Sequence, residues 1–471
     1  MTTLQQGIED ARTRLMGPVI AVIPLGVAIA CSILFFAASL AATFADKTAI
    51  REHVAAAFAS KAWHPHGNDC LVAYMLLAPY DSRLEEVLFP KIPRHVAPGA
   101  GPCPNLRDLL DDTGQRHEFW TYQRYLHGVR TIVAPLLSRL DARDAGKFLF
   151  IASYAQLSLA IVALIWRRWQ QGSGVQKAPF GIGLTLIGCM LLFYVTPYYG
   201  TSLAFASSDL AIYTLLVAAA FVDFARLSPR QTVVLASLFG GIVAYLEFLS
   251  GQAPLGLTLL LAFVAAGASR AESPTALTRR CLWTGYAFIA SFVLCFAIKM
   301  ATVLFIGSDT GAFGPSLLHR MGGSIDAEPP MFGIDITQHA MYSPTAVLYA
   351  LMKLGRETKI LGQGSVALGL SLVLIAIVGL AGGARARWHR LPDRFERTRT
   401  AVLVGAALVT PAWYLLFLNH TIVHAGFMIR PLVGFIAIGV WFGCSELAQA
   451  NSKRSQGIAS RKREALYLYE R

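Results

Sequence analysis

Charged residues are scarce in this chain. Asp, Glu, Lys and Arg make up 15% of its 471 residues, whereas 55% of the residues are hydrophobic. In soluble domains about a quarter of all residues are charged, so this composition excludes an ordinary soluble globular protein. Several stretches of about 18 residues or more are almost free of charge, which is typical of helices that span a membrane.

Familiar motifs are absent as well. The sequence has no nucleophile elbow, no phosphate-binding glycine loop, no dinucleotide fingerprint and no Cys-paired zinc motif. No internal repeat is evident, which disfavours a transporter built from inverted repeats. The alternation of apolar and polar residues that marks an outer-membrane barrel is missing too. The chemistry has to be inferred from polar residues scattered along a helical membrane protein.

Ten apolar runs predict an all-α fold, a polytopic membrane helical bundle with about ten transmembrane helices. We place the spans at residues 18–44, 147–166, 179–196, 209–226, 231–250, 254–270, 281–305, 361–382, 400–418 and 431–448. The first run is longer than the core of a signal peptide, which favours a retained anchor. Residues 1–448 would form a single bundle with its loops, and 449–471 a basic tail.

The formal net charge of +13 raises the question of nucleic acid. The Lys and Arg residues cluster in alternate loops, as they do where basic loops face the cytoplasm. No folded basic domain that could bind a duplex is evident. We therefore expect the lipid bilayer as a partner, no nucleic acid, and both termini in the cytoplasm.

Two loops on the expected outer side are long, at 45–146 and 306–360. Within them, 119–140 and 345–359 are predicted to form amphipathic helices that lie on the membrane surface. Residues 308–344 are broken by Gly and Pro and predict an irregular loop.

Cys70 and Cys103 both fall in the first outer loop. If that side of the membrane is oxidising, a disulfide between them is expected. The alternative is a pair of unrelated thiols.

The segment His64-Pro65-His66-Gly67-Asn68-Asp69 places two histidines and an acid in non-helical chain. In one interpretation Asp69 is a general base at the membrane surface. In another, His64, His66 and Asp69 bind zinc or another divalent metal. The third is a polar loop held in place by the neighbouring Cys70.

Arg124, His127 and Arg130 follow one another at helical spacing and would share one face of a helix. The guanidinium group can donate two parallel hydrogen bonds to a phosphate. A phosphate- or pyrophosphate-binding face is therefore one interpretation. The other is a surface helix that touches anionic lipid headgroups.

Ionisable residues also lie at the expected outer ends of spans. Glu247 and Lys299 are candidates for function because charges inside a membrane are costly, although they could also neutralise each other. Asp209 follows two serines at the start of a span. An acid at this position can cap the helix and interact favourably with the positive end of the helix dipole.

Residues 419–430 hold four polar side chains between two apolar runs, namely Asn419, His420, His424 and Arg430. If this stretch is helical, His420 and His424 face the same way, as a metal pair or a proton-transfer pair requires. The alternative is histidines at the interface that bind backbone carbonyls.

The outline resembles the GT-C superfamily of membrane glycosyltransferases. The features in common are a large outer loop directly after the first span with an acidic residue, Asp69, helices at the interface, and a second outer loop late in the chain. The resemblance covers the whole chain in architecture. The first loop has no Asp-x-Asp motif, since Asp111 and Asp112 are adjacent.

The resemblance implies transfer of a sugar from a polyprenyl-phosphate-linked donor to a glycan or lipid acceptor of the cell envelope. The reaction would take place at the outer face of a bacterial inner membrane, with Asp69 as base and Glu247 as the second choice. The residues expected to bind the substrates are Arg124, His127, Arg130, His420, His424, Arg430 and Lys299. No cofactor is assigned with certainty, and a divalent metal is an open alternative.

Two other functions use similar residues. A transporter or flippase of a lipid-linked sugar or an anion would need charged groups along a path through several spans. A ligase or polymerase of surface glycans would be expected to have its large loop late in the chain.

Overall fold

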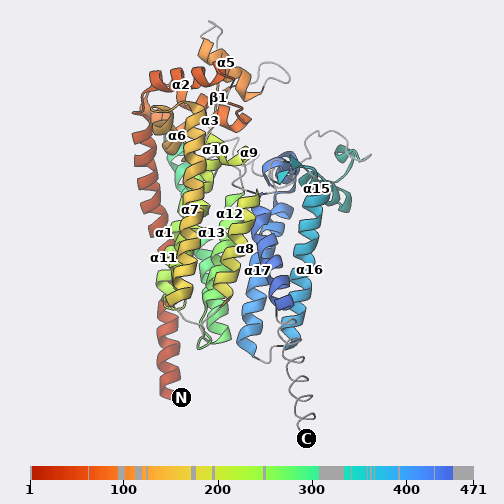
Figure 1. Ribbon diagram of the computed structural model, residues 1–471. Coiled ribbons are helices and arrows are strands. Elements are labelled where there is room, and N and C mark those ends of the chain that lie inside the picture. The colour runs from red at the N-terminus through yellow and green to blue at the C-terminus, as the bar shows by residue number, and fades with distance from the viewer. Residues whose placement is uncertain are drawn as a thin grey trace.

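The computed structural model describes residues 3–61, 63–93, 101–111, 119–122, 126–170, 177–193, 197–247, 251–306, 334–340, 342–357, 359–360, 363–364, 366–390, 393–428 and 430–448. Long helices run side by side as one bundle, and a smaller group of elements covers one end of it (Figure 1). We call this end the capped end.

Eight helices in the described part of the chain are long and apolar enough to cross a membrane. They are α1 (Thr3–Ala42), α7 (Ala142–Gln170), α10 (Leu203–Phe221), α11 (Pro229–Leu246), α13 (Pro274–Phe305), α16 (Val366–Arg390), α17 (Arg394–Leu416) and the last helix, within Arg430–Ala448. The prediction of an all-α polytopic bundle is confirmed, and the protein is a multi-pass membrane protein by this architecture.

Two expected spans are shorter helices, α8 (Lys177–Phe193) and α12 (Gln252–Gly267). Their 17 and 16 residues extend about 25 Å, less than the roughly 30 Å of a bilayer core. Nearly all of α12 is buried, and it packs against helices on several sides, including α17, α13 and α10. It is therefore a central helix of the bundle.

Small residues let the helices approach closely. A Cβ atom on Gly240 of α11 would lie 2.2 Å from the carbonyl oxygen of Phe288 in α13. A Cβ atom on Gly379 of α16 would lie 2.3 Å from the carbonyl oxygen of Gly439 in the last helix. Side chains are excluded at both crossings, as is usual where membrane helices pack through their backbones.

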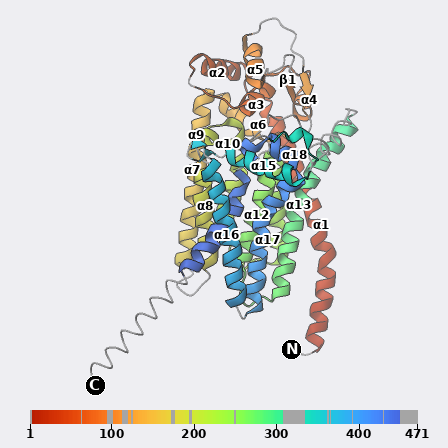
Figure 2. The same ribbon diagram turned by 90° about the vertical axis from the view of Figure 1, so that its right-hand side faces the viewer.

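Five short helices and a two-stranded antiparallel sheet form the cap. Figures 1 and 2 show these elements together at one end of the bundle. They are α2 (Lys47–Ala59), α3 (Gly67–Leu77), α4 (Arg83–Leu88), α5 (Pro102–Asp111), α6 (Val129–Leu137), β1 (Lys91–Pro93) and β2 (Phe119–Thr121). The cap has its own apolar core, which includes Val54, Tyr74 and Val133. The predicted disulfide between Cys70 and Cys103 is confirmed, and it joins α3 to α5.

A second small group lies at the same end (Figure 2). It contains η1 (Ile336–Gln338), α15 (Pro344–Glu357), α18 (Leu418–Val423) and α19 (Ala425–Met428). The expected helix at 345–359 is confirmed by α15, which packs Tyr349 against Leu418 and Ile422. The remaining short elements are α9 (Pro197–Gly200), β3 (Lys359–Ile360), β4 (Gln363–Gly364) and η2 (Arg430–Leu432).

The expected helix over 119–140 is wrong in its first half. Phe119–Thr121 is a strand that pairs antiparallel with Lys91–Pro93, and the helix starts only at Val129. His127 precedes that helix with a positive φ, so it does not share a helical face with Arg130. Arg124 lies outside the described residues.

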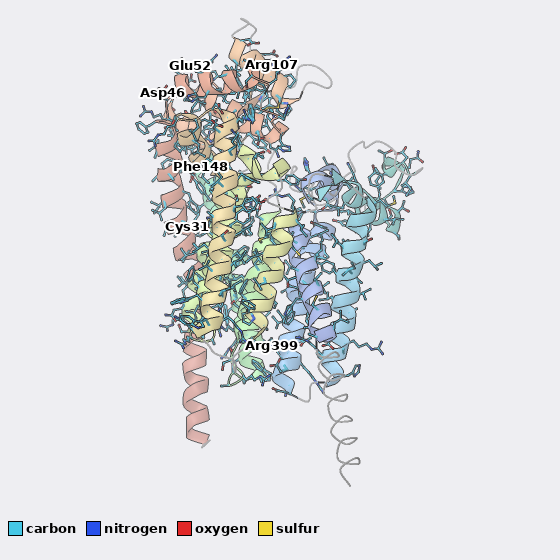
Figure 3. All side chains as sticks on the ribbon, in the orientation of Figure 1. Cys31, Asp46, Glu52, Arg107, Phe148 and Arg399 are labelled. Carbon is cyan, nitrogen blue, oxygen red and sulfur yellow. A yellow bond between two sulfur atoms is a disulfide. The ribbon has the colours of Figure 1, made fainter. Side chains whose placement is uncertain are left out.

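Arginines at the opposite end of the bundle bind helix ends. Arg167 donates from Nη1 to the carbonyl oxygen of Val222, the C-cap of α10, at 2.7 Å. Arg280 donates to the carbonyl oxygen of Phe224. Figure 3 places Arg399 at this end as well. Arg167 and Arg280 thus satisfy carbonyl groups at or just after the end of α10, whereas Arg399 pairs with the carboxylate of Glu396.

Candidate functional site

Two groups of buried polar side chains lie at the capped end in the described part of the chain. The first, which we call the basic cluster, consists of His127, Arg130 and Lys299. The second, which we call the ion-pair layer, consists of Asp209, Gln252 and Arg430. The structure thus brings together three of the predicted substrate-binding residues in the first group.

His127 reaches the basic cluster through a tight turn before α6. Its φ of 56° lies in the left-handed region, and its Nε2 atom is 2.5 Å from the carbonyl oxygen of Tyr122. A residue with a side chain adopts this conformation only where surrounding contacts hold it. One such contact is adjacent, because the N–H of Gly128 donates to the carbonyl oxygen of Tyr245 at 2.9 Å.

Tyr245 fixes this turn to two long helices. Its backbone belongs to the last turn of α11, and its ring stacks on Phe35 of α1 at 4.1 Å between centroids. Its hydroxyl group is 2.9 Å from the hydroxyl group of Ser39, near the end of α1. The basic cluster is therefore held where α1, α6 and α11 meet.

Arg130 is buried and has hydrogen-bond donors that the described chain does not use. It is 4% exposed, and Nη2 donates to the backbone carbonyl oxygen of Glu86 at 2.8 Å. The Nε and Nη1 atoms have no hydrogen-bond partner among the described residues. The carboxylate of Glu86 pairs with Lys47 at 2.7 Å. Buried donors without partners are costly, so this position is suited to an added acceptor.

Burial and neighbouring charges determine the protonation of the cluster. Burial lowers the pKa of His127 well below its usual range, and the charges of Lys299 and Arg130 lower it further. Burial also lowers the pKa of Arg130, while Tyr80 and Glu86 raise it. Arginine stays protonated in proteins, so Arg130 is a cation beside a neutral His127.

The ion-pair layer is centred on Asp209 and Arg430. The guanidinium group of Arg430 pairs with the carboxylate of Asp209, and both residues are almost completely buried. The Nε2 atom of Gln252 donates to the same carboxylate at 3.2 Å. Arg430 also lies over the rings of Tyr199 and Phe205, at 4.7 and 5.2 Å from their centroids. Cation–π contacts of this kind stabilise a desolvated cation.

The expected capping role of Asp209 is wrong. Helix α10 starts at Leu203, six residues before Asp209, and its N-cap is Ser202, whose hydroxyl group accepts from the N–H of Phe205. Asp209 therefore lies inside the helix and faces α12 and η2 through its partners.

Glu247 holds the start of α12. Its carboxylate accepts from the backbone N–H groups of Gly251, Gln252 and Ala253, at 3.0, 2.9 and 3.2 Å. Gly251 has φ of 73°, a conformation that favours glycine. Tyr245 binds the turn that carries the basic cluster, and Glu247 binds the backbone of Gln252 in the ion-pair layer. Because Glu247 follows Tyr245 by two residues, the Cα atoms of these two anchors lie at most about 7 Å apart.

Asp69 has a similar role at α10. It accepts from the hydroxyl group of Ser202 at 2.5 Å, and from the backbone N–H groups of Ala204 and His66 at 2.9 and 3.1 Å. Burial raises the pKa of Asp69, and the charge of His66 and these hydrogen bonds oppose the rise. Its expected role as the catalytic base is untested, and its hydrogen bonds join α3 to α10.

The metal site expected at His64, His66 and Asp69 is not formed. In the part of the chain that the structure describes, no three His, Cys, Asp or Glu side chains are grouped so as to hold a metal ion. The physical reason is the capping box at the start of α3, where Asp69 turns back to the N–H of His66. His64 is exposed.

His420 and His424 lie next to one another, with ring centroids 4.5 Å apart. The helix on which they were expected to share a face is shorter, since α18 ends at Val423 and His424 is its C-cap. His420 and Asn419 are buried next to the small core under α15. The pair follows α17 and precedes α19, whose end leads to Arg430.

Sequence reasoning missed three members of this region. These residues are Gln252, Tyr199 and Tyr245. They carry no charge, so a search for ionisable residues in an apolar sequence does not select them. The one available signal was the glycine beside each turn, Gly128 and Gly251, which allows a close approach of the backbone.

No protein-family model, no curated protein and no solved structure matches the chain.

Proposed function

We propose that this protein is an integral-membrane glycosyltransferase. It moves a sugar from a polyprenyl-phosphate-linked donor to a glycan or lipid acceptor of the cell envelope. The observation that carries the proposal is the basic cluster, where buried Arg130 has two donor nitrogens without a described partner and Lys299 lies close by.

A phosphate group suits this cluster better than a neutral ligand. Its oxygens accept the hydrogen bonds that Nε and Nη1 of Arg130 leave unmade, and the planar guanidinium group can bind two of them at once. The side-chain nitrogen of Lys299 adds a further hydrogen-bond donor beside Arg130. Cations placed where a leaving phosphate gains charge stabilise the transition state of its departure.

The surroundings of the cluster suit a lipid. Lys299 belongs to the apolar helix α13, six residues before its end at Phe305, and Phe305 is 93% exposed. Phe36 of α1 is also exposed, one residue after the ring that stacks on Tyr245. A polyprenyl tail can lie against these apolar surfaces while its phosphate group reaches Arg130.

The proposed orientation puts the capped end outside the cytoplasm. The Cys70–Cys103 disulfide belongs to the cap, and disulfides persist in oxidising compartments. The arginines at the opposite end, such as Arg167 and Arg280, fit the cytoplasmic side of a bacterial inner membrane.

The distribution of charge disfavours transport through the bundle. Buried charged side chains of the described spans lie near the helix ends, at Asp209, Lys299 and Arg430 on the capped side and at Arg280 and Glu396 on the other. The buried polar residues between them are hydroxyl groups, such as those of Ser237, Thr258 and Ser291. A path for an anion would need charged groups along its length.

The test is binding of a polyprenyl phosphate to the full-length protein in lipid nanodiscs. We expect Arg130→Ala and Lys299→Met to weaken binding by about 10- to 100-fold, the loss of a charge-assisted hydrogen bond. The matched control is Arg107→Ala, an exposed arginine of the cap (Figure 3). Equal binding by all four proteins would contradict the proposed site.

A further inference from the structure

We propose that Asp209 and Gln252 bind the hydroxyl group of the acceptor and that Asp209 takes its proton, an inference that rests on the glycosyl transfer proposed above. Asp209 and Gln252 are both fully or almost fully buried, on α10 and at the start of α12. Their amide–carboxylate contact of 3.2 Å places them in one site.

The other buried carboxylates at the capped end are committed to structure. Asp69 and Glu247 each accept three hydrogen bonds, which include two and three backbone N–H groups at the start of a helix. Glu86 pairs with Lys47. Withdrawal of Asp69 or Glu247 for proton transfer would leave helix N–H groups without acceptors.

Asp209 differs because its described partners, Arg430 and Gln252, reach it with side chains. Arg430 and Gln252 can change rotamer without unwinding a helix, so a substrate hydroxyl group can replace one of them as the hydrogen-bond partner of Asp209. Arg430 remains close as a counterion and can follow the charge that develops on the substrate.

Gln252 provides a second and independent observation that points to a bound hydroxyl group. Its residue exposure is 0%, and its Oε1 atom has no hydrogen-bond donor among the described residues. The amide orientation is fixed, since the reverse orientation would point Oε1 at the carboxylate of Asp209. A buried carbonyl oxygen beside a carboxylate is complementary to a hydroxyl group, which can donate to either oxygen.

Glu247 and Asp69 act as positioning residues for this site. Glu247 fixes the backbone of Gln252, and Asp69 fixes Ser202 at the start of the helix that carries Asp209. Asp69 and Glu247, the two bases expected from the sequence, thus position Asp209 and Gln252, and Asp209 is the base that we propose.

Two short helices lie next to the ion-pair layer. The hydroxyl group of Tyr199 in α9 donates to the carbonyl oxygen of Gly426 in α19, across the face of Arg430. Both helices have four residues.

The step balances as follows. The acceptor hydroxyl oxygen forms a bond to the anomeric carbon of the donor sugar, and its proton passes to the carboxylate of Asp209. The bond from the anomeric carbon to the phosphate oxygen breaks, and its electron pair stays on the phosphate held by Arg130 and Lys299. Asp209 then returns the proton to water.

The experiment measures transfer from a polyprenyl-phosphoryl hexose with a labelled sugar, in membranes of the producing cell that supply the acceptor. The variants are Asp209→Asn, the double variant Asp209→Asn with Arg430→Gln, and Gln252→Met. The double variant leaves no unpaired buried charge, which protects the fold. The control is Asp223→Asn, which removes a carboxylate paired with Arg167 at the other end.

We expect transfer to fall by about 100-fold or more in both Asp209 variants, because a general base contributes about that factor. Binding of polyprenyl phosphate should stay at the wild-type level in both, and Asp223→Asn should transfer normally. Gln252→Met should need more acceptor membrane to reach half of its maximal rate. Recovery of wild-type transfer in the double variant would overturn the base role, since the pair would then be structural only.

Normal acceptor dependence in Gln252→Met would show that its Oε1 atom binds only water, and would overturn the hydroxyl site. A wild-type protein that binds polyprenyl phosphate through Arg130 but transfers no label would overturn glycosyl transfer and leave the anion site standing. Absence of binding would overturn the anion site itself. The failures of the two proposals are therefore distinguishable.

Discussion

The backbone N–H of Gly128 donates a hydrogen bond of 2.9 Å to the carbonyl oxygen of Tyr245. A Cβ atom on Gly128 would lie 2.4 Å from that oxygen, so no side chain fits between the turn and α11. This contact places His127 and Arg130 beside Lys299 and binds the cap to the bundle. The basic cluster depends on it.

The first prediction therefore concerns Gly128→Ala. The added methyl group must push the turn away from Tyr245, which moves His127 and Arg130 away from Lys299. We expect polyprenyl phosphate binding to fall at least as far as in Arg130→Ala, while size-exclusion profiles stay monodisperse. Gly101→Ala is the matched control in the cap, because a Cβ there meets nothing within 4 Å. Unchanged binding in Gly128→Ala would show that the turn does not position the cluster.

The second prediction is a loss of stability on acidification. The pKa of buried His127 is depressed below the value of about 6.5 in an unfolded chain, so protons favour the unfolded state. The stability that neutral His127 provides is present above about pH 6.5 and is lost as the pH falls toward the folded-state pKa. Thermal melts at about pH 7.5 and about pH 5.5 should differ less for His127→Gln than for the wild type.

The control for this measurement is His64→Gln, which removes an exposed histidine of the cap. That variant should keep the pH sensitivity of the wild type. Equal pH sensitivity of the wild type and His127→Gln would contradict the buried, neutral state of His127.

The third prediction concerns the cap. The Cys70–Cys103 disulfide joins residues with a sequence separation of 33. A disulfide that closes a loop of this size stabilises a fold by about 2–4 kcal/mol. Cys103→Ser should make α5 sensitive to limited proteolysis, while the long helices stay protected. Mass spectrometry of the oxidised wild-type protein should recover one linked peptide pair that contains both cysteines. Two alkylated thiols in that sample would refute the disulfide.

The fourth prediction separates Glu247 from Asp209. In Glu247→Gln the remaining oxygen can still accept from the N–H groups of Gln252 and Ala253, and only the acceptor for Gly251 is lost, so we expect most of the transfer activity to remain. Glu247→Ala removes the acceptor altogether and should lower the melting temperature and the activity together. A loss of activity in Glu247→Gln equal to that in Asp209→Asn would instead assign a catalytic role to Glu247.

Much of the bundle could be predicted from the sequence because apolar length sets the spans. Eight expected spans have matching long helices, and the cysteines in one outer loop predicted the disulfide. The strand at Phe119–Thr121 could not be predicted, because its partner strand at Lys91–Pro93 lies far away in sequence. Alternating and helical patterns are hard to separate in such short segments.

The site was only partly predictable, and small errors had large effects. The predicted start of the fourth span at residue 209 made Asp209 a helix cap, whereas the helix starts at Leu203 and buries that residue. Glu247 and Asp69 drew attention as acids, but their roles depend on backbone N–H groups that only the fold brings to them. Arg130 and Lys299 were both expected to bind the substrates, but their common place beside His127 depends on the turn before α6, which the helical pattern did not predict.

The central claim is that Arg130 and Lys299 hold the phosphate of a polyprenyl carrier. The most direct measurement is an electron cryo-microscopy structure of the full-length protein in nanodiscs with polyprenyl phosphate. We predict phosphate density within hydrogen-bond reach of Nε or Nη1 of Arg130 and close to Lys299. Phosphate density bound elsewhere, with the guanidinium group of Arg130 left as it is now, would contradict the account.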